Sequence, residues 1–500
     1  MENQSSISYR LAKDQGANDP DGQGNWKDGN SNGVSTRRTL EPLPFEVVSS
    51  FPKTLLEKSQ NRLAVNALSS ADPSEVIKIV SSRVDNPQVF NTKIPLEGAP
   101  ITNQRATGRC WLFAATNVFR VPIMKKRKLE SLELSQKYLF YYDKLEKSNF
   151  FLEQIIDTAE EDVDSRIVQR LLEGIVADGG QWDMVYNLVK KYGLVPQAIY
   201  PETWSAQNSR FLKAILGTKL REFALKLRNL SRADGTTAEA DLIHSKAEMM
   251  QEIQKILTLL LGAPPHPMQE FTWEYTDKDG KTQEVRTTPM SFAEETCYSD
   301  LDCNINNMAS LVHDPRHDPL RLLTVSRLGN VIGGRDTTYV NVDMDTLKTA
   351  CVAMIQAGQP IFFGCDFGKF RDKATGILDM GNFDYESGFG TDMLGMSKEE
   401  RLVMGESRLT HAMILTAVHL CESTGKPIRW KIQNSHGPDS GSKGCYVMTD
   451  AWMDEFVYQV VIDLRFVDEK VRDVMKQDPI VLPLWDPIGA LAQLQESTIL

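Results

Sequence analysis

The sequence predicts an α+β protein, because helical patterns dominate its first half and strand patterns dominate its second half. Apolar residues recur at helical spacing from about residue 108 to residue 262, whereas short β-branched and aromatic runs follow from about residue 270. The composition, 41% hydrophobic and 25% charged, excludes a collagen-like or wholly disordered chain. No stretch approaches the roughly 18 apolar residues of a membrane span, so we expect no membrane association.

The polar N-terminal segment and the cysteine content predict a protein of a reducing compartment. Residues 1–42 are rich in Gly, Asn, Asp and Ser, and bury too little apolar area to offset the entropy cost of ordering, so we expect a flexible tail. The tail's acidic residues argue against a mitochondrial transit peptide, and no secretory signal is visible. Seven cysteines without a CxxC pair indicate neither a disulfide framework nor a zinc ribbon. We therefore expect a cytoplasmic protein.

Residues 43–204 are predicted to form a helix-rich half. A first apolar helix begins at Cys110, and a second is expected over residues 135–145 from apolar residues at helical spacing. A third is expected over Trp182–Tyr192 and ends at Gly193, a typical C-terminal position for glycine.

The remaining chain divides into three predicted parts. Residues 205–262 predict an inserted helical hairpin that turns near residues 233–235. Residues 263–478 predict a strand-rich half, and residues 479–500 a C-terminal arm with an extension. The strands are expected over 272–275, 321–325, 361–364, 412–418, 428–432 and 445–447.

Cys110 is the first candidate for a functional residue. It opens an apolar helix, where backbone N–H groups and the positive end of the helix dipole would stabilise a thiolate. Gln104, six residues upstream, would bring a side-chain amide near the same sulfur as a donor to an oxyanion. The alternative is that Cys110 is a small buried hydrophobe. The other six cysteines are expected to be buried or incidental packing residues.

A cysteine nucleophile needs a base, and the base needs an orienting group. His411 opens an apolar strand pattern, a position that often marks the edge of a cleft. Asn434 follows a second strand-like run, and neighbouring strands would let it hydrogen-bond His411. Considered alone, His411 could be a structural histidine, and Asn434 with Ser435 could be a simple turn.

These residues lie in a longer series of motifs. The motifs, in chain order, are Asn103-Gln104-x3-Gly108-Arg109-Cys110-Trp111, Asp178-Gly179-Gly180-Gln181-Trp182, Thr410-His411-Ala412-Met413, Asn434-Ser435-x-Gly437 and Gly489-Ala490-Leu491-Ala492. They resemble the papain-like cysteine peptidases, and specifically the bleomycin hydrolase family. The resemblance covers nearly everything after about residue 50.

The resemblance implies a two-lobed papain-like fold and a cysteine aminopeptidase that cleaves peptide bonds through an acyl-enzyme. It also implies peptide substrates, a homohexamer and a resting thiolate–imidazolium ion pair. The site residues that it implies are the nucleophile Cys110, the base His411, the orienting residue Asn434, the oxyanion donor Gln104, and the substrate-binding residues Gly179, Gly180 and Ala492.

No cofactor or metal is expected. Cys297 and Cys303 have no accompanying histidine pair, so a metal or disulfide role is disfavoured. His313 and His317 have a metal-compatible spacing but flank a proline, which favours a structural turn.

Two departures from the family pattern concern the site. His436 stands where papain-like enzymes usually carry a tryptophan that shields the Asn–His contact, so we expect that contact to be exposed and restoration of Trp to raise activity. Family members typically end near Ala492, where the terminal carboxylate meets the substrate amine. This chain continues from Gln493 to Leu500, so the extension is either trimmed or leaves the cleft.

The inserted hairpin carries an excess of basic residues in a chain whose formal charge is −11. A basic surface that includes Lys226 and Arg228 would bind nucleic acid weakly. The alternative is a solvated helix face or a salt-bridged subunit surface. A catalytically weak assembly that binds nucleic acid or peptides is thus the rival to the peptidase.

Overall fold

The computed structural model describes residues 41–232, 238–299 and 303–493. The chain divides into two compact units, Met1–Asn66 and Ala67–Leu500. The first unit contains α1 (Phe45–Glu57) and most of α2 (Ser59–Ser70). The predicted tail before residue 41, the turn near residues 233–235 and the extension beyond Gln493 lie outside the described residues.

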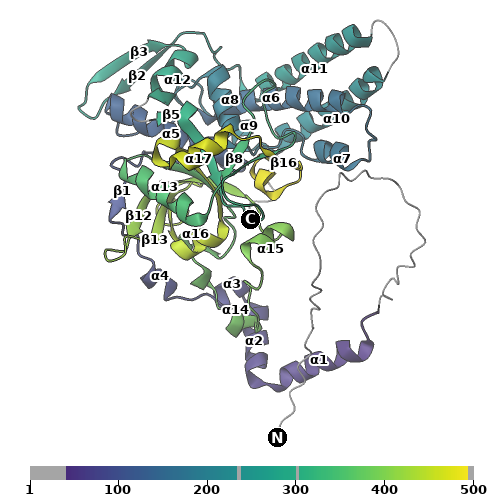
Figure 1. Ribbon diagram of the computed structural model, residues 1–500, viewed down its shortest axis with the longest axis vertical. Helices are drawn as coiled ribbons and strands as arrows, with labels where there is room; N and C mark the ends of the chain where they lie inside the picture. The colour runs from purple at the N-terminus through teal and green to yellow at the C-terminus, as the bar shows by residue number, and fades with distance from the viewer. Residues whose placement is uncertain (1–40, 233–237, 300–302, 494–500) are drawn as a thin grey trace. The chain divides into compact units, whose positions relative to one another are not determined.

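Helices precede strands in the second unit, which confirms the predicted α+β class (Figure 1). The helices of its first part are α3 (Pro73–Val76), α4 (Ser82–Asp85), α5 (Cys110–Arg127), α6 (Gln136–Asp157), α7 (Arg166–Glu173), α8 (Trp182–Tyr192), α9 (Trp204–Gln207), α10 (Arg210–Ser231), α11 (Ala238–Leu261) and α12 (Pro289–Cys297). Helix α8 matches its predicted bounds and ends at Gly193, whose φ of +77° suits glycine.

Most strands form one mixed sheet with the order β10-β11-β14-β13-β12-β9-β15-β6-β8-β7-β16, and β1 (Thr92–Lys93) pairs with β12. Its strands are β6 (Met308–Val312), β7 (Arg321–Val325), β8 (Thr338–Asn341), β9 (Ile361–Cys365), β10 (Arg371–Asp372), β11 (Ile377–Leu378), β12 (His411–Leu420), β13 (Pro427–Gln433), β14 (Cys445–Thr449), β15 (Val457–Asp463) and β16 (Ile480–Leu482). The six predicted strands all exist; the first of them belongs to a separate hairpin, β2 (Phe271–Thr276) with β3 (Thr282–Thr287).

The shorter elements of the second part lie between these strands or after them. They are β4 (Tyr298–Ser299), β5 (Cys303–Asn304), α13 (Met344–Gln356), α14 (Tyr385–Phe389), α15 (Lys398–Val403), α16 (Asp450–Phe456), α17 (Glu469–Asp473) and the 3₁₀ helix η5 (Pro487–Gln493) of the C-terminal arm.

Helix α6 is longer than the sequence pattern predicted. The expected helix ended at residue 145, but α6 continues to Asp157 and buries Phe151, Leu152 and Ile155 in its later turns. The pattern was hidden because several charged residues on this helix are also buried, and these break the amphipathic stripe. Helix α6 packs against both helices of the inserted hairpin.

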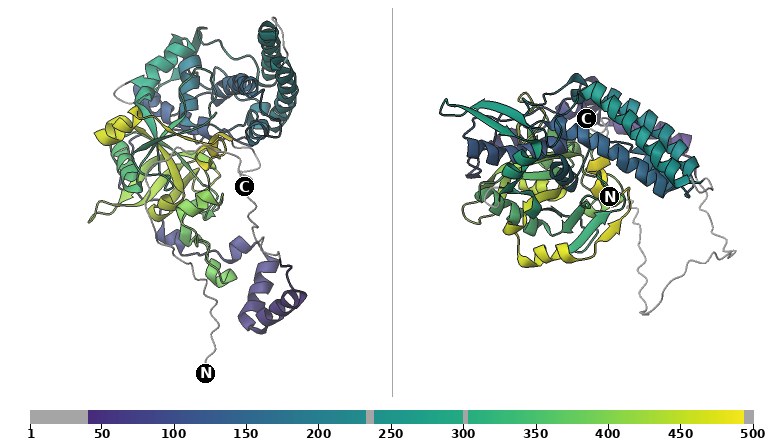
Figure 2. Two further views of the ribbon diagram at one scale, coloured as in Figure 1. Left: turned by 45° about the vertical axis from the view of Figure 1, so that its right-hand side comes forward. Right: turned by 90° about the horizontal axis from the view of Figure 1, so that it is seen from above.

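The inserted hairpin consists of α10 and α11, which pack against each other and against α6 (Figures 1 and 2). Leu212, Leu216, Leu220 and Leu227 of α10 are all buried, at the spacing of one helix face. The hairpin therefore extends the hydrophobic core of the helix-rich half.

Arg228 of this hairpin does not belong to an open basic surface, and that part of the sequence-based prediction is wrong. Its guanidinium is buried and donates to the backbone oxygens of Thr158, at 2.7 Å, and Glu161. These carbonyls follow the end of α6, where unpaired carbonyl groups attract a cation. Lys226 is exposed, so the basic surface is smaller than the sequence suggested.

Helix α5 lies at the junction of the two halves of the second unit. It packs against β12 and β9, and nearly all of its first fifteen residues are buried. The start of α5 is thereby placed beside the start of β12. No helix among the described residues has both the length and the apolar character that crossing a membrane requires.

Candidate active site

Cys110 is the first residue of α5, and its side chain is completely buried. The backbone N–H of Ala412 on β12 lies close enough to interact with the Cys110 thiol. Ala412 is the neighbour of His411, so the start of the helix brings the thiol beside the first residues of the strand.

His411 and Asn434 are brought together by the antiparallel pairing of β12 with β13. Ile414 pairs with Gln433 in this ladder, and Asn434 follows directly after β13. His411 Nε2 lies 2.8 Å from Asn434 Oδ1, as the prediction of neighbouring strands required. His411 is only 2% exposed and Asn434 is fully buried.

The hydrogen bonds of Asn434 determine which nitrogen of His411 carries a proton. Asn434 Oδ1 also accepts from the backbone N–H of Ser435 at 2.7 Å, so it acts only as an acceptor. His411 Nε2 must then donate, which leaves a lone pair on Nδ1. Among the described residues, His411 Nδ1 is a buried atom with no hydrogen-bond partner, so it is placed to accept a proton.

The buried surroundings favour the neutral forms of both side chains. Burial raises the pKa of the Cys110 thiol to about 12, and the backbone N–H groups of Ala412, Trp111 and Cys110 oppose this only in part. Burial also lowers the pKa of His411 well below 6.5, and His436 adds to that effect. These directions oppose the expected resting ion pair, because neither charge is stabilised by water at this position.

Gln104 lies in the same buried region, close to the nucleophile loop. Its Nε2 donates to the Thr107 backbone oxygen at 2.7 Å, and its Oε1 accepts from the Ser435 hydroxyl at 2.7 Å. The amide nitrogen has two hydrogens, so one remains beyond the bond to Thr107. Ser435, the residue that follows Asn434, thereby links Gln104 to Asn434.

His436 and Phe367 cover the His411–Asn434 contact. The centre of the His436 ring lies 4.8 Å from that of the His411 ring, and the two rings are tilted by 30°. Phe367 follows two residues after the end of β9, and its ring centre lies 4.9 Å from that of His411. His436 Nδ1 also lies 3.1 Å from Asn434 Nδ2. The expectation that replacement of Trp by His436 exposes this contact is therefore wrong, because two rings shield it.

The predicted substrate-binding residues Gly179 and Gly180 are both buried. The Gly179 carbonyl accepts from Lys147 Nζ at 2.5 Å. A Cβ at Gly180 would come within 2.4 Å of the Trp111 ring, so glycine is required here for packing. Whether these glycines also bind substrate stays a prediction.

Asp178 precedes these glycines and connects them to the nucleophile. Its buried carboxylate lies 2.8 Å from Lys144 Nζ on α6 and 3.1 Å from Lys213 Nζ on α10. It also accepts from the backbone N–H of Gly108 at 3.2 Å. Lys144 and Lys213 hold the pKa of Asp178 well below its usual value despite its burial. The Asp178 backbone oxygen accepts from the Trp111 indole at 2.7 Å.

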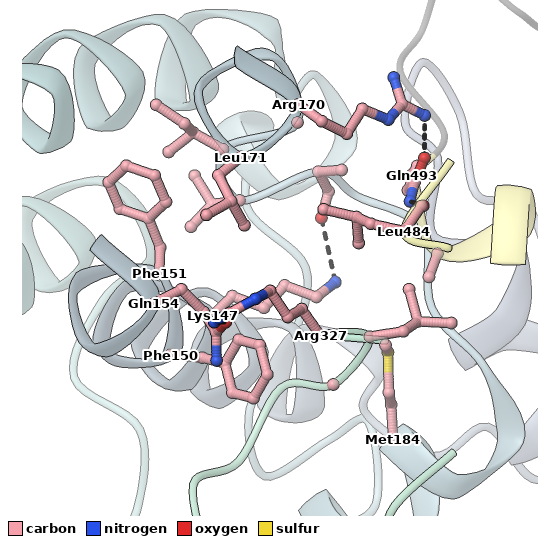
Figure 3. Close-up of a pocket in the computed structure, with 17 residues that line it drawn as sticks. Lys147, Phe150, Phe151, Gln154, Arg170, Leu171, Met184, Arg327, Leu484 and Gln493 are labelled. Carbon is pink, nitrogen blue, oxygen red and sulfur yellow. Dashed lines mark hydrogen bonds between the residues drawn. The ribbon is translucent and has the colours of Figure 1, made fainter. Parts of the chain in front are cut away.

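Ala492 is buried near the described end of the arm, in η5. It lines a pocket of about 90 Å³ together with Lys147, Met184 and Arg327 (Figure 3). On the side of the arm, Gln493 accepts a hydrogen bond from Arg170 of α7. Lys147 therefore lines the same pocket as Ala492 and also donates a hydrogen bond to the Gly179 carbonyl.

Sequence reasoning missed the buried charged group of Asp178 and one partly exposed cysteine, Cys421. Asp178 was included in the sequence analysis only as part of a motif. A lysine on an apolar helix face, Lys144, was the signal that could have indicated a buried acidic partner. Cys421 was expected to be a packing residue, but it is partly exposed after β12 and hydrogen bonds from Ser423 and Thr424 lower its pKa to about 6. All seven cysteines are free thiols.

Among the described residues, no His, Cys, Asp and Glu side chains form a group that could hold a metal.

The fold, with a helix-opening cysteine beside a strand-opening histidine, defines a papain-like cysteine peptidase. A solved structure of PepW from Lactobacillus rhamnosis superposes with a TM-score of 0.84 at 38% identity, covering 90% of this chain and 99% of PepW. The family model for the Peptidase C1-like family matches residues 42–489. The chain belongs to the Peptidase C1-like family.

Two curated relatives narrow the type of enzyme within this family. Human bleomycin hydrolase is 44% identical over 81% of this chain and 89% of its own length. The mitochondrial cysteine proteinase 1 of Saccharomyces cerevisiae is 40% identical over 92% of this chain and 95% of its own length. The chain is thus a cysteine aminopeptidase of bleomycin hydrolase type.

We expect Asp178→Asn to lower stability by about 3–5 kcal/mol, because it removes the carboxylate that pairs with the buried Lys144 and with Lys213. The matched control is Asp279→Asn, which removes the same charge from an exposed ion pair with Lys128 and should leave the melting temperature nearly unchanged. Thermal unfolding followed by circular dichroism compares the two. Equal melting temperatures for both variants would show that the buried pair does not anchor the fold.

Proposed function

We propose that the peptidase cleaves peptide and amide bonds through Cys110, His411 and Asn434, with an acyl-enzyme intermediate. The observation that carries this proposal is the 2.8 Å contact between His411 Nε2 and Asn434 Oδ1, which directs the lone pair of Nδ1 away from Asn434. The thiol of Cys110 lies beside the backbone N–H of Ala412, the residue that follows His411. A base with its free nitrogen near a thiol can activate that thiol.

The reaction begins from the neutral pair. As the Cys110 sulfur attacks the scissile carbonyl, its proton passes to His411 Nδ1, and the imidazolium keeps its Nε2–H bond to Asn434. The oxyanion takes hydrogen bonds from the Cys110 backbone N–H and the remaining N–H of Gln104. His411 then protonates the leaving amine. A water molecule, deprotonated by His411, releases the acyl group.

Burial of the site has a consequence for this cycle. Because the Cys110 side chain has no exposed surface, a substrate carbonyl reaches the sulfur only after neighbouring side chains move. The same exclusion of water strengthens each hydrogen bond to the developing oxyanion. We therefore expect the proton transfer to be coupled to substrate binding.

We propose that the C-terminal arm recognises the substrate's amino group through a carboxylate at Ala492, and that peptide substrates lie along Gly179 and Gly180. The place of Ala492 in the lining of the pocket of about 90 Å³ supports this arrangement. We further propose a cytosolic location, since all seven cysteines are free thiols, as expected in a reducing compartment. The proposed assembly is a homohexamer.

Weak binding of nucleic acid, the rival proposal, has little support among the described residues. Besides Arg228, Arg221 donates to the Leu172 backbone oxygen, Lys213 pairs with Asp178, and Lys219 pairs with Glu222. These intramolecular contacts use much of the positive charge of the hairpin. We therefore favour the interpretation as a salt-bridged helix face.

Replacement of Cys110 tests the nucleophile directly. We expect Cys110→Ala to abolish peptide hydrolysis, because the sulfur of Cys110 is the atom that attacks the scissile carbonyl in the proposed mechanism. Cys421→Ser serves as the matched control and the background for labelling, since Cys421 is partly exposed and its pKa of about 6 makes it a competing thiolate. In that background, a thiol-directed peptidase inhibitor should label one site per chain, identified by mass spectrometry as Cys110. Hydrolysis that survives Cys110→Ala would refute the mechanism.

Truncation tests the proposed role of the arm. A chain that ends at Ala492 should discriminate more strongly against N-acetylated peptides than the full-length chain, because its terminal carboxylate can pair with a free substrate amine. A chain that ends at Glu496 is the control, since it is shorter but has no carboxylate at Ala492. Intact mass spectrometry first establishes whether the purified chain is already trimmed. Equal discrimination by all three chains would contradict the proposal.

Light scattering during gel filtration tests the assembly. A homohexamer predicts a solution mass six times that of the chain, independent of concentration over the range used for activity. A monomeric mass would contradict the hexamer without affecting the proposed chemistry.

A further inference from the structure

His436 occupies a distinctive position between the proposed catalytic residues and an open hollow. Its half-buried ring packs on His411, and its Nδ1 lies 3.1 Å from Asn434 Nδ2. It also lines a hollow of about 750 Å³ with Arg371, Lys373 and Asp439. The ring is thus in contact with the proposed site on one side and with this hollow on another.

The direction of the hydrogen bonds follows from the donors available. Asn434 Oδ1 accepts from His411 Nε2 and from the Ser435 backbone N–H, so its Nδ2 faces the remaining neighbour, His436. An amide nitrogen only donates, and therefore His436 Nδ1 must accept and its proton must be on Nε2. A tryptophan at this position has only an N–H donor and could not take this part.

We propose that His436 is a positioning residue that holds the Asn434 amide with its carbonyl oxygen toward His411. This inference rests on the proposed function of His411 and Asn434. If the amide rotated by half a turn, its NH₂ group would face two further donors, His411 Nε2–H and the Ser435 N–H. His436 Nδ1 favours the productive orientation because it gives the NH₂ group an acceptor.

Protonation of His436 is incompatible with this arrangement. A proton on Nδ1 would face the Asn434 NH₂ group, and its charge would oppose the imidazolium that forms on His411 during the reaction. Burial, Arg371 and Lys373 lower the pKa of His436 to about 4, so the neutral form prevails near neutral pH. The charged and titratable groups around His436 are His411 on β12, Arg371 and Asp372 on β10, Lys373 and Asp439 in the adjoining loops, and Glu75 and Lys78 across the hollow.

Two nearly isosteric variants separate hydrogen bonding from packing. Both His436→Asn and His436→Leu lose the ring, but only the asparagine offers an acceptor at the position of Nδ1. We expect kcat for the leucine variant to fall roughly three- to tenfold below that of the asparagine variant, the effect of one neutral hydrogen bond, with KM changed less than about twofold. His436→Trp should resemble the leucine variant. Equal kcat for the asparagine and leucine variants would overturn the proposal.

The pH dependence of kcat gives a second readout that a purely structural role would not change. As pH falls through about 4, the wild-type kcat should drop as His436 gains a proton, whereas the asparagine variant should keep its kcat to lower pH. Superimposable acid limbs would overturn the proposal. The control is His419→Asn, which removes a histidine from the far end of the same strand and should leave both kcat and the acid limb unchanged.

Measurements are restricted to conditions where circular dichroism shows each variant folded, and kcat is expressed per site titrated by the thiol-directed inhibitor. The outcome is separable from that of the proposed function. If Cys110→Ala is inactive and the His436 variants do not differ, only the positioning role fails. If Cys110→Ala stays active, the proposed function fails, and the positioning role fails with it.

Discussion

The carboxylate of Asp178 joins three elements that lie far apart in the sequence. Lys144 comes from the long helix α6, Lys213 from the inserted hairpin, and the Gly108 N–H from the loop that leads to Cys110. A buried carboxylate is tolerated only when opposite charge and N–H donors compensate its lost hydration. The position of the nucleophile therefore depends on the same ion pairs that attach the hairpin to the core.

This dependence explains why the inserted hairpin is more than an appendage. Its basic residues look like a surface for anions when the sequence is considered alone, yet Lys213 and Arg228 both point into the fold. One neutralises Asp178 and the other satisfies carbonyl groups at the end of α6. The hairpin thereby stabilises the helix on which Lys144 and Lys147 are placed, and Lys147 in turn bonds Gly179.

The proposed chemistry depends on the exclusion of water. Burial raises the pKa of Cys110 and lowers that of His411, and both directions favour the neutral side chains. The hydrogen bonds around Asn434 then determine the tautomer of His411, and the rings of Phe367 and His436 keep water from this contact.

The sequence by itself predicted the fold class, several of the helices, six of the strands, and the proposed catalytic residues Cys110, His411 and Asn434, because periodicity and motif spacing are local properties. Helix α8 and the main strands follow their patterns closely. Only the tertiary structure decided which charges are buried, that His436 shields rather than exposes its neighbours, and that Arg228 faces inward. These three features depend on which elements meet in space. The sequence does not distinguish a charged side chain that faces water from one that faces a buried partner.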